Sequence, residues 1–262
     1  MSAQTQVNGF TRITSTNKGL YKIGTRGFLV PERSNQPELL DRGKGSAKDV
    51  QANLTEMWRI NRAFGGVSAL TSHLFPALRS ADQPLKLVDI GTGSAVLPRY
   101  IAQWAYHNKL RVEIYALDIS GRNLDVACAD MSSYPEVHLI QADAAAMPFA
   151  INSVDYYISS LFLHHLQPQE VIQLLRAMYH FARQGIIMSD LVRHYLPLVA
   201  FRLVQPVFAR NHLTRHDGLV SIRRGYTPNE LLTLAREAGI NGAQVFKHFP
   251  WRMTLTAEKS HV

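Results

Sequence analysis

The 262-residue sequence predicts an α/β fold in which helices cover both faces of a mostly parallel sheet. Strand-like runs alternate with helical segments through the middle of the chain, at 85–89, 111–118, 137–141, 154–160 and 185–190. Two further runs, 243–248 and 251–256, can pair around Pro250 as a closing antiparallel hairpin. We therefore expect seven strands, with the last strand antiparallel to the others.

Helical periodicity surrounds these strands. Apolar residues recur at helical spacing from Lys48 to Leu78, with a break at Gly65 and Gly66. Pro168 to Arg183 reads as a helix that ends at Gly185, and 227–230 (TPNE) matches a capping box for a helix that stops at Gly239. We divide the chain into a basic, loosely ordered arm (1–35), an N-terminal helical cap (36–80) and a core (81–262), with a helical lid inserted after the fifth strand at about 191–225.

Composition narrows the class of protein, its expected location and its partners. With 46% hydrophobic and 18% charged residues, the chain can bury a substantial core. The single cysteine, Cys128, excludes an internal disulfide and a cysteine-built metal site. No secretory signal is visible, and charged residues and prolines interrupt the most lipophilic segment, 191–209, so we expect a cytoplasmic protein without a transmembrane segment. The net charge of +8 would suit nucleic acid, anionic lipid or an acidic ligand, but the charges are dispersed.

A glycine-containing turn follows the first predicted strand, in KLVDIGTGSAVLPRY (86–100). Gly91 and Gly93 lack side chains, so the backbone can approach a ligand closely there. Pro98 is suited to the first position of the next helix. A dinucleotide fingerprint requires a small residue at position 96, where this chain has valine, and this difference weakens a nicotinamide or flavin hypothesis.

The pattern D-x-G-x-G-x-A that begins at Asp89 resembles the first motif of class I S-adenosylmethionine-dependent methyltransferases. Asp118 ends the second predicted strand and Asp143 follows the third, where that family uses acids for the ribose hydroxyls and the adenine amino group. Three carboxylates at successive strand ends also suit a ligand bound at the carboxyl edge of a parallel sheet, although each could instead cap a helix or a turn. The sequence departs from many family members at Ala95, where they carry a third glycine.

The resemblance spans roughly residues 48–256 and implies a Rossmann-like sheet with S-adenosylmethionine as cofactor. SSLFLHHL (159–166) and YTPNELLTLAREAGI (226–240) are similar to the ubiquinone and menaquinone biosynthesis branch of the family. The resemblance places the cofactor against Asp89, Gly91, Thr92, Gly93, Asp118, Ile119, Asp143, Ala144 and Ser160.

The segment after the fourth strand narrows the choice of methyl acceptor. Enzymes that methylate exocyclic amines of nucleic acid usually carry Asn/Asp-Pro-Pro-aromatic there, whereas this chain has SLFL at 160–163. Pyrimidine C5 methylation needs a nucleophilic cysteine, but Cys128 lies in a predicted helix, and arsenic methylation needs several cysteines. An oxygen or an activated ring carbon remains as the acceptor atom.

Transfer to oxygen or carbon also requires removal of a proton. The candidate bases are His164 and His165 after the fourth strand, the pair His216 and Asp217 in the lid, and Asp190 at the end of the fifth strand. Each has an alternative structural role: the paired histidines could cap a helix or pack beneath the ligand, and Asp190 could be an N-cap. Arg223 and Arg224 are candidates for an anion site. Apolar residues of the lid are candidates for a substrate channel, and these are Leu196, Leu198, Val199, Phe201, Leu203, Val207 and Phe208.

Several further segments are similar to bacterial polyketide-associated methyltransferases, namely ELLDRG, RINRAFGG, SDLVRHY and RHDGLVSIRRGYTP. We therefore expect methyl transfer to a hydroxyl, or an activated carbon, of a lipophilic aromatic or polyketide-like small molecule. An RNA or protein methyltransferase, and an S-adenosylmethionine-binding module without turnover, are the alternatives. We expect no metal and no nucleic acid partner, while peripheral membrane contact and a homo-oligomer stay open.

Overall fold

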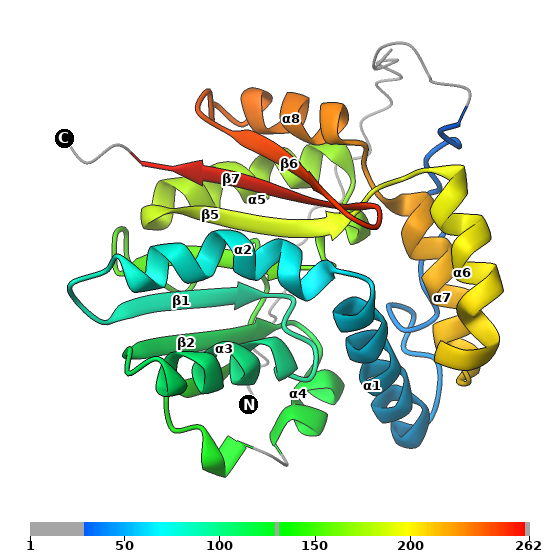
Figure 1. The fold of residues 1–262 in the computed structure, drawn as a ribbon, viewed down its shortest axis with the longest axis horizontal. Helices are drawn as coiled ribbons and strands as arrows, with labels where there is room; N and C mark the ends of the chain where they lie inside the picture. Colours follow the sequence, from blue (N-terminus) through cyan, green and yellow to red (C-terminus); the bar gives the residue numbers. More distant parts are fainter. Residues whose placement is uncertain (1–28, 129–130, 260–262) are drawn as a thin grey trace, which may run out of the picture.

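The computed structural model describes residues 29–128 and 131–259 and contains a seven-stranded sheet (Figure 1). The strand order is β3-β2-β1-β4-β5-β7-β6. The strands are β1 Leu85–Ile90, β2 Val112–Asp118, β3 Val137–Gln141, β4 Val154–Ser160, β5 Ala182–Leu191, β6 Gln244–His248 and β7 Arg252–Glu258. Only β7 runs against the rest, pairing antiparallel with both β5 and β6. The predicted seven-stranded α/β fold with one antiparallel strand is therefore confirmed.

Helices cover both faces of this sheet. They are α2 Gly66–Arg79, α3 Val96–His107, α4 Gly121–Cys128, α5 Pro168–Phe181 and α8 Pro228–Glu237. One apolar core joins the sheet to α5 and α8, and a second joins it to α2, α3 and α4. Strand β4 contributes Tyr157 to the first core and Tyr156 and Ile158 to the second. This alternation along a strand buried on both faces is what the apolar runs predicted.

Three local boundaries can be compared with the sequence. The capping box at Thr227 and Glu230 is present, and α8 begins at Pro228 as predicted. Helix α3 begins at Val96, two residues before Pro98, because the chain already turns at Ala95 with φ of 52°. Gly185 does not stop α5, which ends at Phe181; it lies within β5, where a Cβ would meet the Ala257 carbonyl oxygen at 2.3 Å.

A cap of separate segments covers the carboxyl edge of the sheet. It consists of residues 29–46, helix α1 Ala47–Ala63 and the lid helices α6 Tyr195–Phe208 and α7 His212–Arg224. In Figure 1 the arrowheads of β1 and β5 point toward α1, α6 and α7, which pack on one another. Helix α2, by contrast, lies against β5 and β7, so α1 and the segment before it form the part of the predicted cap that lies over the edge.

The lid does not line a channel in the way the sequence suggested. Leu196, Val199, Leu203 and Val207 point to solvent along one side of α6, with Leu203 76% exposed. Other apolar lid residues pack inward, around Phe201 and Ile222, against Ile60 of α1. A helix with many apolar residues can place them on two sides, and sequence periodicity alone did not separate these sides. Within the described ranges no helix is long and apolar enough to cross a membrane. The first 28 residues of the predicted basic arm lie outside the described residues.

Candidate active site

A cleft of about 580 Å³ lies between the carboxyl ends of the parallel strands and the cap. Its walls come from the β1–α3 turn, the ends of β2 and β4, the segment after β3, helix α1 and residues 38–43. All nine residues predicted for the cofactor line this cleft: Asp89, Gly91, Thr92, Gly93, Asp118, Ile119, Asp143, Ala144 and Ser160. Residues from four strand ends therefore converge on one cavity, as the topology of a parallel sheet requires.

The turn after β1 is shaped by its glycines. Gly91 has φ of 69°, and a Cβ there would lie 2.4 Å from Phe162 Cδ2. Its amide and that of Thr92 both donate to the Leu117 carbonyl of β2, at 2.9 and 3.0 Å. Gly93, with φ of 59°, has open space on its Cα apart from Leu54 at 3.5 Å. The turn thus packs tightly against the protein on one side and leaves bare backbone toward the cleft.

Two carboxylates lie beside this turn. Asp89 is buried and accepts a hydrogen bond from the Thr92 hydroxyl at 2.7 Å; burial, reinforced by nearby Asp118, raises its pKa to about 7. Asp118 accepts from the Gly93 and Ser120 amides, each at 2.8 Å, and burial raises its pKa. A carboxylate oxygen accepts more than one hydrogen bond, so Asp118 keeps acceptor capacity for a ligand.

These features fit S-adenosylmethionine. Asp118 offers a partly satisfied carboxylate for ribose hydroxyls, and the adjacent Ile119 exposes 67% of its surface as an apolar contact for a base. Asp143 accepts from the Ala145 amide at 2.9 Å and lies in the same cavity. The cleft volume falls within the range of small-molecule sites.

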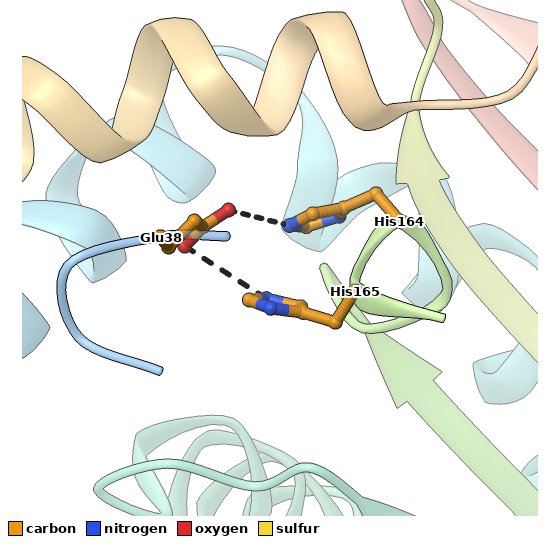
Figure 2. A group of neighbouring side chains, drawn as sticks. All are labelled: Glu38, His164 and His165. Carbon is orange, nitrogen blue, oxygen red and sulfur yellow. Dashed lines mark ion pairs between the residues drawn. The ribbon is translucent and has the colours of Figure 1, made fainter. Parts of the chain in front are cut away.

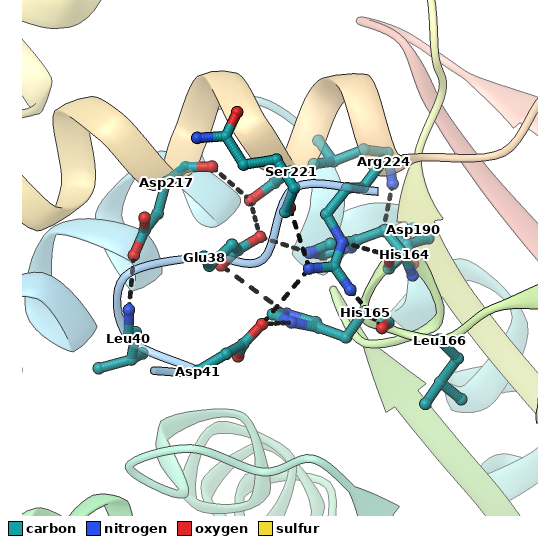
Figure 3. A network of polar contacts seen from close by, with 12 residues as sticks. Glu38, Leu40, Asp41, His164, His165, Leu166, Asp190, Asp217, Ser221 and Arg224 are labelled. Atoms are coloured by element: carbon teal, nitrogen blue, oxygen red, sulfur yellow. Dashed lines mark hydrogen bonds and ion pairs between the residues drawn. The ribbon is translucent and has the colours of Figure 1, made fainter. Parts of the chain in front are cut away.

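A buried polar network ties the cap to the sheet edge (Figure 3). Glu38 accepts from the Ser221 hydroxyl of α7 at 2.5 Å, and Asp217 of α7 accepts from the Leu39 and Leu40 amides at 2.8 and 3.1 Å. Arg224 donates to the carbonyls of His164, at 3.0 Å, and of His165. The network therefore joins three segments that are distant in sequence. Because the guanidinium of Arg224 donates to these carbonyls, Arg224 is not the free anion site that the sequence suggested.

His164 lies at the centre of this network and is 1% exposed. Its Nδ1 is 2.7 Å from Asp190 Oδ1 and its Nε2 is 3.4 Å from Glu38 Oε1. Burial opposes the charged ring, but Asp190 and then Glu38 outweigh burial and raise the pKa of His164 to about 10. In turn the histidines hold the pKa of Glu38 at about 2 against the effect of its burial. His164 is therefore an imidazolium at neutral pH, and neither it nor Asp190 lines the cleft.

His165, the next residue, does line the cleft. Its Nδ1 is 2.9 Å from Asp41 Oδ2 (Figure 3). Its Nε2 is 4.0 Å from Glu38 Oε2 (Figure 2). The two rings lie side by side, with centroids 4.3 Å apart, and both reach Glu38, but the His164 side chain is 1% exposed and the His165 side chain is 24% exposed. The structure thus separates the paired histidines into one buried and one facing the cavity.

The second predicted pair is divided in a similar way. His216 Nδ1 is 2.7 Å from Asp217 Oδ1, but His216 does not line the cleft. Asp217 does, although the amides of the 38–41 segment occupy its carboxylate. The sequence analysis missed Glu38 and Asp41 as site residues. They occur in ELLDRG, which showed no periodicity and no spacing that would have placed them opposite the histidines.

One group of side chains has the spacing of metal ligands. Glu38, His164 and His165 offer atoms that lie within 4.8 Å of one another, and no second such group occurs among the described residues. Carboxylates hold Nδ1 of both rings, so the Nε2 atoms would be the ligands. Glu38 and Asp190 already balance the His164 charge without a metal, and our expectation of a metal-free site stays a prediction.

Comparisons with known proteins agree with this geometry. Residues 87–185 match a family described as a methyltransferase domain. A search of curated proteins finds no match. Residues 87–185 thus form a methyltransferase domain, and the chain has the Rossmann-like methyltransferase fold, for which S-adenosylmethionine is the cofactor.

Solved structures share the fold at low identity. A putative O-methyltransferase from Nostoc punctiforme PCC 73102 is 21% identical, with a TM-score of 0.52 over 76% of this chain and 59% of that one. The plantazolicin methyltransferase, in complex with a triazolic desmethylPZN analog and SAH, is 14% identical, with a TM-score of 0.60 over 82% and 98%. The citrinin polyketide synthase CMeT domain is 11% identical, with a TM-score of 0.52 over 69% and 48%. The chain thus spans about half to three fifths of two of these structures and nearly all of the third.

Replacing Asp118 tests the cofactor site. Asp118→Asn removes the charged acceptor, so the affinity for S-adenosylhomocysteine should fall roughly 10- to 100-fold, about 1.5–3 kcal/mol. Isothermal titration calorimetry measures this change. Asp125→Asn, at an exposed position on α4, is the matched control and should bind as the wild type does. Unchanged affinity of Asp118→Asn would remove Asp118 from the site.

The raised pKa of His164 predicts a pH-dependent stability. The folded protein holds this proton up to about pH 10, whereas an unfolded chain releases it near pH 6.5. The stabilisation is therefore complete below about pH 6.5 and is lost as the pH rises toward 10. Urea unfolding should show the free energy of unfolding falling between pH 7 and 9, by up to about 1.4 kcal/mol per pH unit. His164→Gln should flatten this slope, and exposed His107→Gln should keep it; equal slopes in all three proteins would contradict the assignment.

Proposed function

We propose that the protein transfers a methyl group from S-adenosylmethionine to a hydroxyl, or an activated carbon, of a lipophilic aromatic or polyketide-like small molecule. The observation that carries this proposal is the apolar part of the cleft lining. It includes Leu54, Met57, Trp58, Leu161, Phe162 and Leu166. An apolar cavity with a few polar groups selects small lipophilic ligands. The likeness to an O-methyltransferase and to a polyketide synthase domain supports the same class.

When bound, S-adenosylmethionine supplies an electrophilic methyl group on a sulfonium. The chain's own tasks are to orient the acceptor and to take its proton. We assign the second task to His165, whose ring lines the cleft and whose Nδ1 is held by Asp41. With Nδ1–H donated to the carboxylate, Nε2 is the basic nitrogen, and the proton of the acceptor hydroxyl passes to it as the new bond to the methyl carbon forms.

His164, the buried neighbour of His165, has a positioning role in this proposal. His164 receives charge compensation from two carboxylates and holds the backbone of the 3-10 helix, since its own amide donates to Asp190 Oδ2 at 2.9 Å. A group kept protonated in this way is a poor base at neutral pH. His164 therefore fixes where His165 points.

Substitution of the histidines separates these roles. His165→Asn should lower kcat by a factor of roughly 10² to 10⁴, because proton removal is lost. Cofactor affinity should change little, because Asp89 and Asp118 stay in place. Single-turnover transfer together with S-adenosylhomocysteine titration measures both quantities. His216→Asn, outside the cleft, is the control and should retain activity. Wild-type turnover in His165→Asn would exclude this residue as the base.

The acceptor class is tested by labelled methyl transfer into a whole cell extract. Separation into organic-soluble, RNA and protein fractions should place the label in the organic fraction. Label in RNA or protein would overturn the substrate class and support the alternative suggested by the basic charge. Cofactor binding without label in any fraction would instead favour a binding module. Cytoplasmic location stays a prediction, and peripheral membrane contact and a homo-oligomer stay open.

A further inference from the structure

A second, smaller cavity lies beside the cleft. It measures about 70 Å³ and is enclosed by α1, α6, α7 and the turn between β6 and β7. Met57 and Leu161 form walls of both cavities, so the smaller one is the next space beyond the apolar side of the cleft. A water molecule needs roughly 10–15 Å³ of such volume, so the cavity holds a group of several atoms. Its lining is apolar with few exceptions, of which one is Arg252.

Arg252 is buried without a hydrogen-bond partner for its guanidinium. It begins β7, is 4% exposed, and forms no side-chain hydrogen bond or close ion pair with a residue that the structure describes, although the charge of Asp190 acts on it. Its Nε is fully enclosed and unsatisfied. The amide oxygen of Asn61 is also unsatisfied and lies near Nε, on the same side of Gly66. One amide oxygen can meet only a fraction of the five N–H donors of a guanidinium.

The other buried arginines of the described chain are treated differently. Arg193 donates to the Gly225 carbonyl at 3.2 Å and pairs with Glu230 at 2.5 Å. Arg224 donates to several carbonyls and pairs with Asp41 at 3.6 Å. Nε of Arg193 is unsatisfied, as is that of Arg252, but the terminal nitrogens of Arg193 have an acceptor and a carboxylate partner. Arg252 has neither among the described residues, and it lines a cavity.

An unpaired buried cation is costly. Removal of a charge from water costs several kcal/mol unless an opposite charge and hydrogen bonds replace the water. Burial lowers the pKa of Arg252 to about 10 although the charge of Asp190, the partner of His164, opposes this, so the group still carries its charge at neutral pH. An anion entering the cavity would supply the missing acceptors and a charge not shared with His164, and a carboxylate matches the planar guanidinium through two parallel hydrogen bonds.

We propose that this cavity is a subsite for a carboxylate group of the methyl acceptor, bound by Arg252. The inference rests on the proposed function and narrows its substrate class to apolar acids. The acceptor's apolar body lies between Met57 and Leu161, its carboxylate meets Arg252, and the atom to be methylated lies in the cleft near His165. Arg252 is thus a specificity-determining residue and takes no part in the proton transfer that we assign to His165.

Binding of a simple acid tests the subsite without any methyl transfer. The probes are cyclohexanecarboxylate and its neutral match cyclohexylmethanol, titrated into the full chain saturated with S-adenosylhomocysteine. Trp251 lines the same cavity, so its fluorescence reports occupancy. The acid should bind at least tenfold more tightly than the alcohol. Arg252→Met should abolish the preference, Arg252→Lys should retain part of it, and exposed Arg202→Met on α6 should leave it unchanged. Equal binding of acid and alcohol, or a preference that survives Arg252→Met, would overturn the proposal.

Thermal unfolding of the same variants gives an independent readout. If Arg252 has no partner in the free protein, Arg252→Met removes an uncompensated charge and should raise Tm. A Tm well below that of the wild type would show that the guanidinium is already satisfied and would contradict the proposal. Both experiments are separate from the labelled-methyl assay. Label in RNA with a retained acid preference would refute the proposed function alone, whereas label in the organic fraction without that preference would refute only the subsite.

Discussion

The ion pairs of His164 with Asp190 and Glu38 are the interaction on which the site depends. They join the end of β5, the turn after β4 and the segment before α1 in a region with almost no water. Each charge there would be costly alone, so the three segments are stable only when they are assembled together. Their assembly positions the cap over the sheet edge and turns His165 toward the cleft. The position of the base that we propose, His165, thus follows from the neutralisation of a buried charge.

The sheet supplies the other half of the site. Parallel strands end at one edge, and the β1–α3 turn and Asp118 meet there with bare backbone and partly satisfied carboxylate oxygens. This half belongs to the residues that match the methyltransferase domain, whereas on our proposal the cap and the start of β7 bind the acceptor. Arg252 begins β7, outside that domain, and lines the small cavity beside the cap helices. On the same proposal, cofactor and acceptor recognition come from separate segments.

The sequence allowed prediction of the sheet, the capped last helix and the convergence of Asp89, Asp118 and Asp143, because strand periodicity and capping are local signals. It did not reveal Glu38 and Asp41, which lie in an aperiodic segment and reach the histidines only through tertiary packing. It also could not distinguish His164 from His165, since the two rings lie side by side and only tertiary packing buries one and leaves the other at the cleft. The apolar lid residues were assigned to a channel because periodicity shows an apolar side of a helix and not what covers it.

A crystal structure with S-adenosylhomocysteine and an apolar acid tests the account most directly. We expect the ribose hydroxyls within hydrogen-bond distance of Asp118, the acid in the cleft beside His165, and His164 still enclosed between Asp190 and Glu38. The cofactor product away from the β1–α3 turn, or a cap displaced so that His164 rather than His165 meets the acceptor, would contradict the central claim that the buried charge network positions the catalytic side chain.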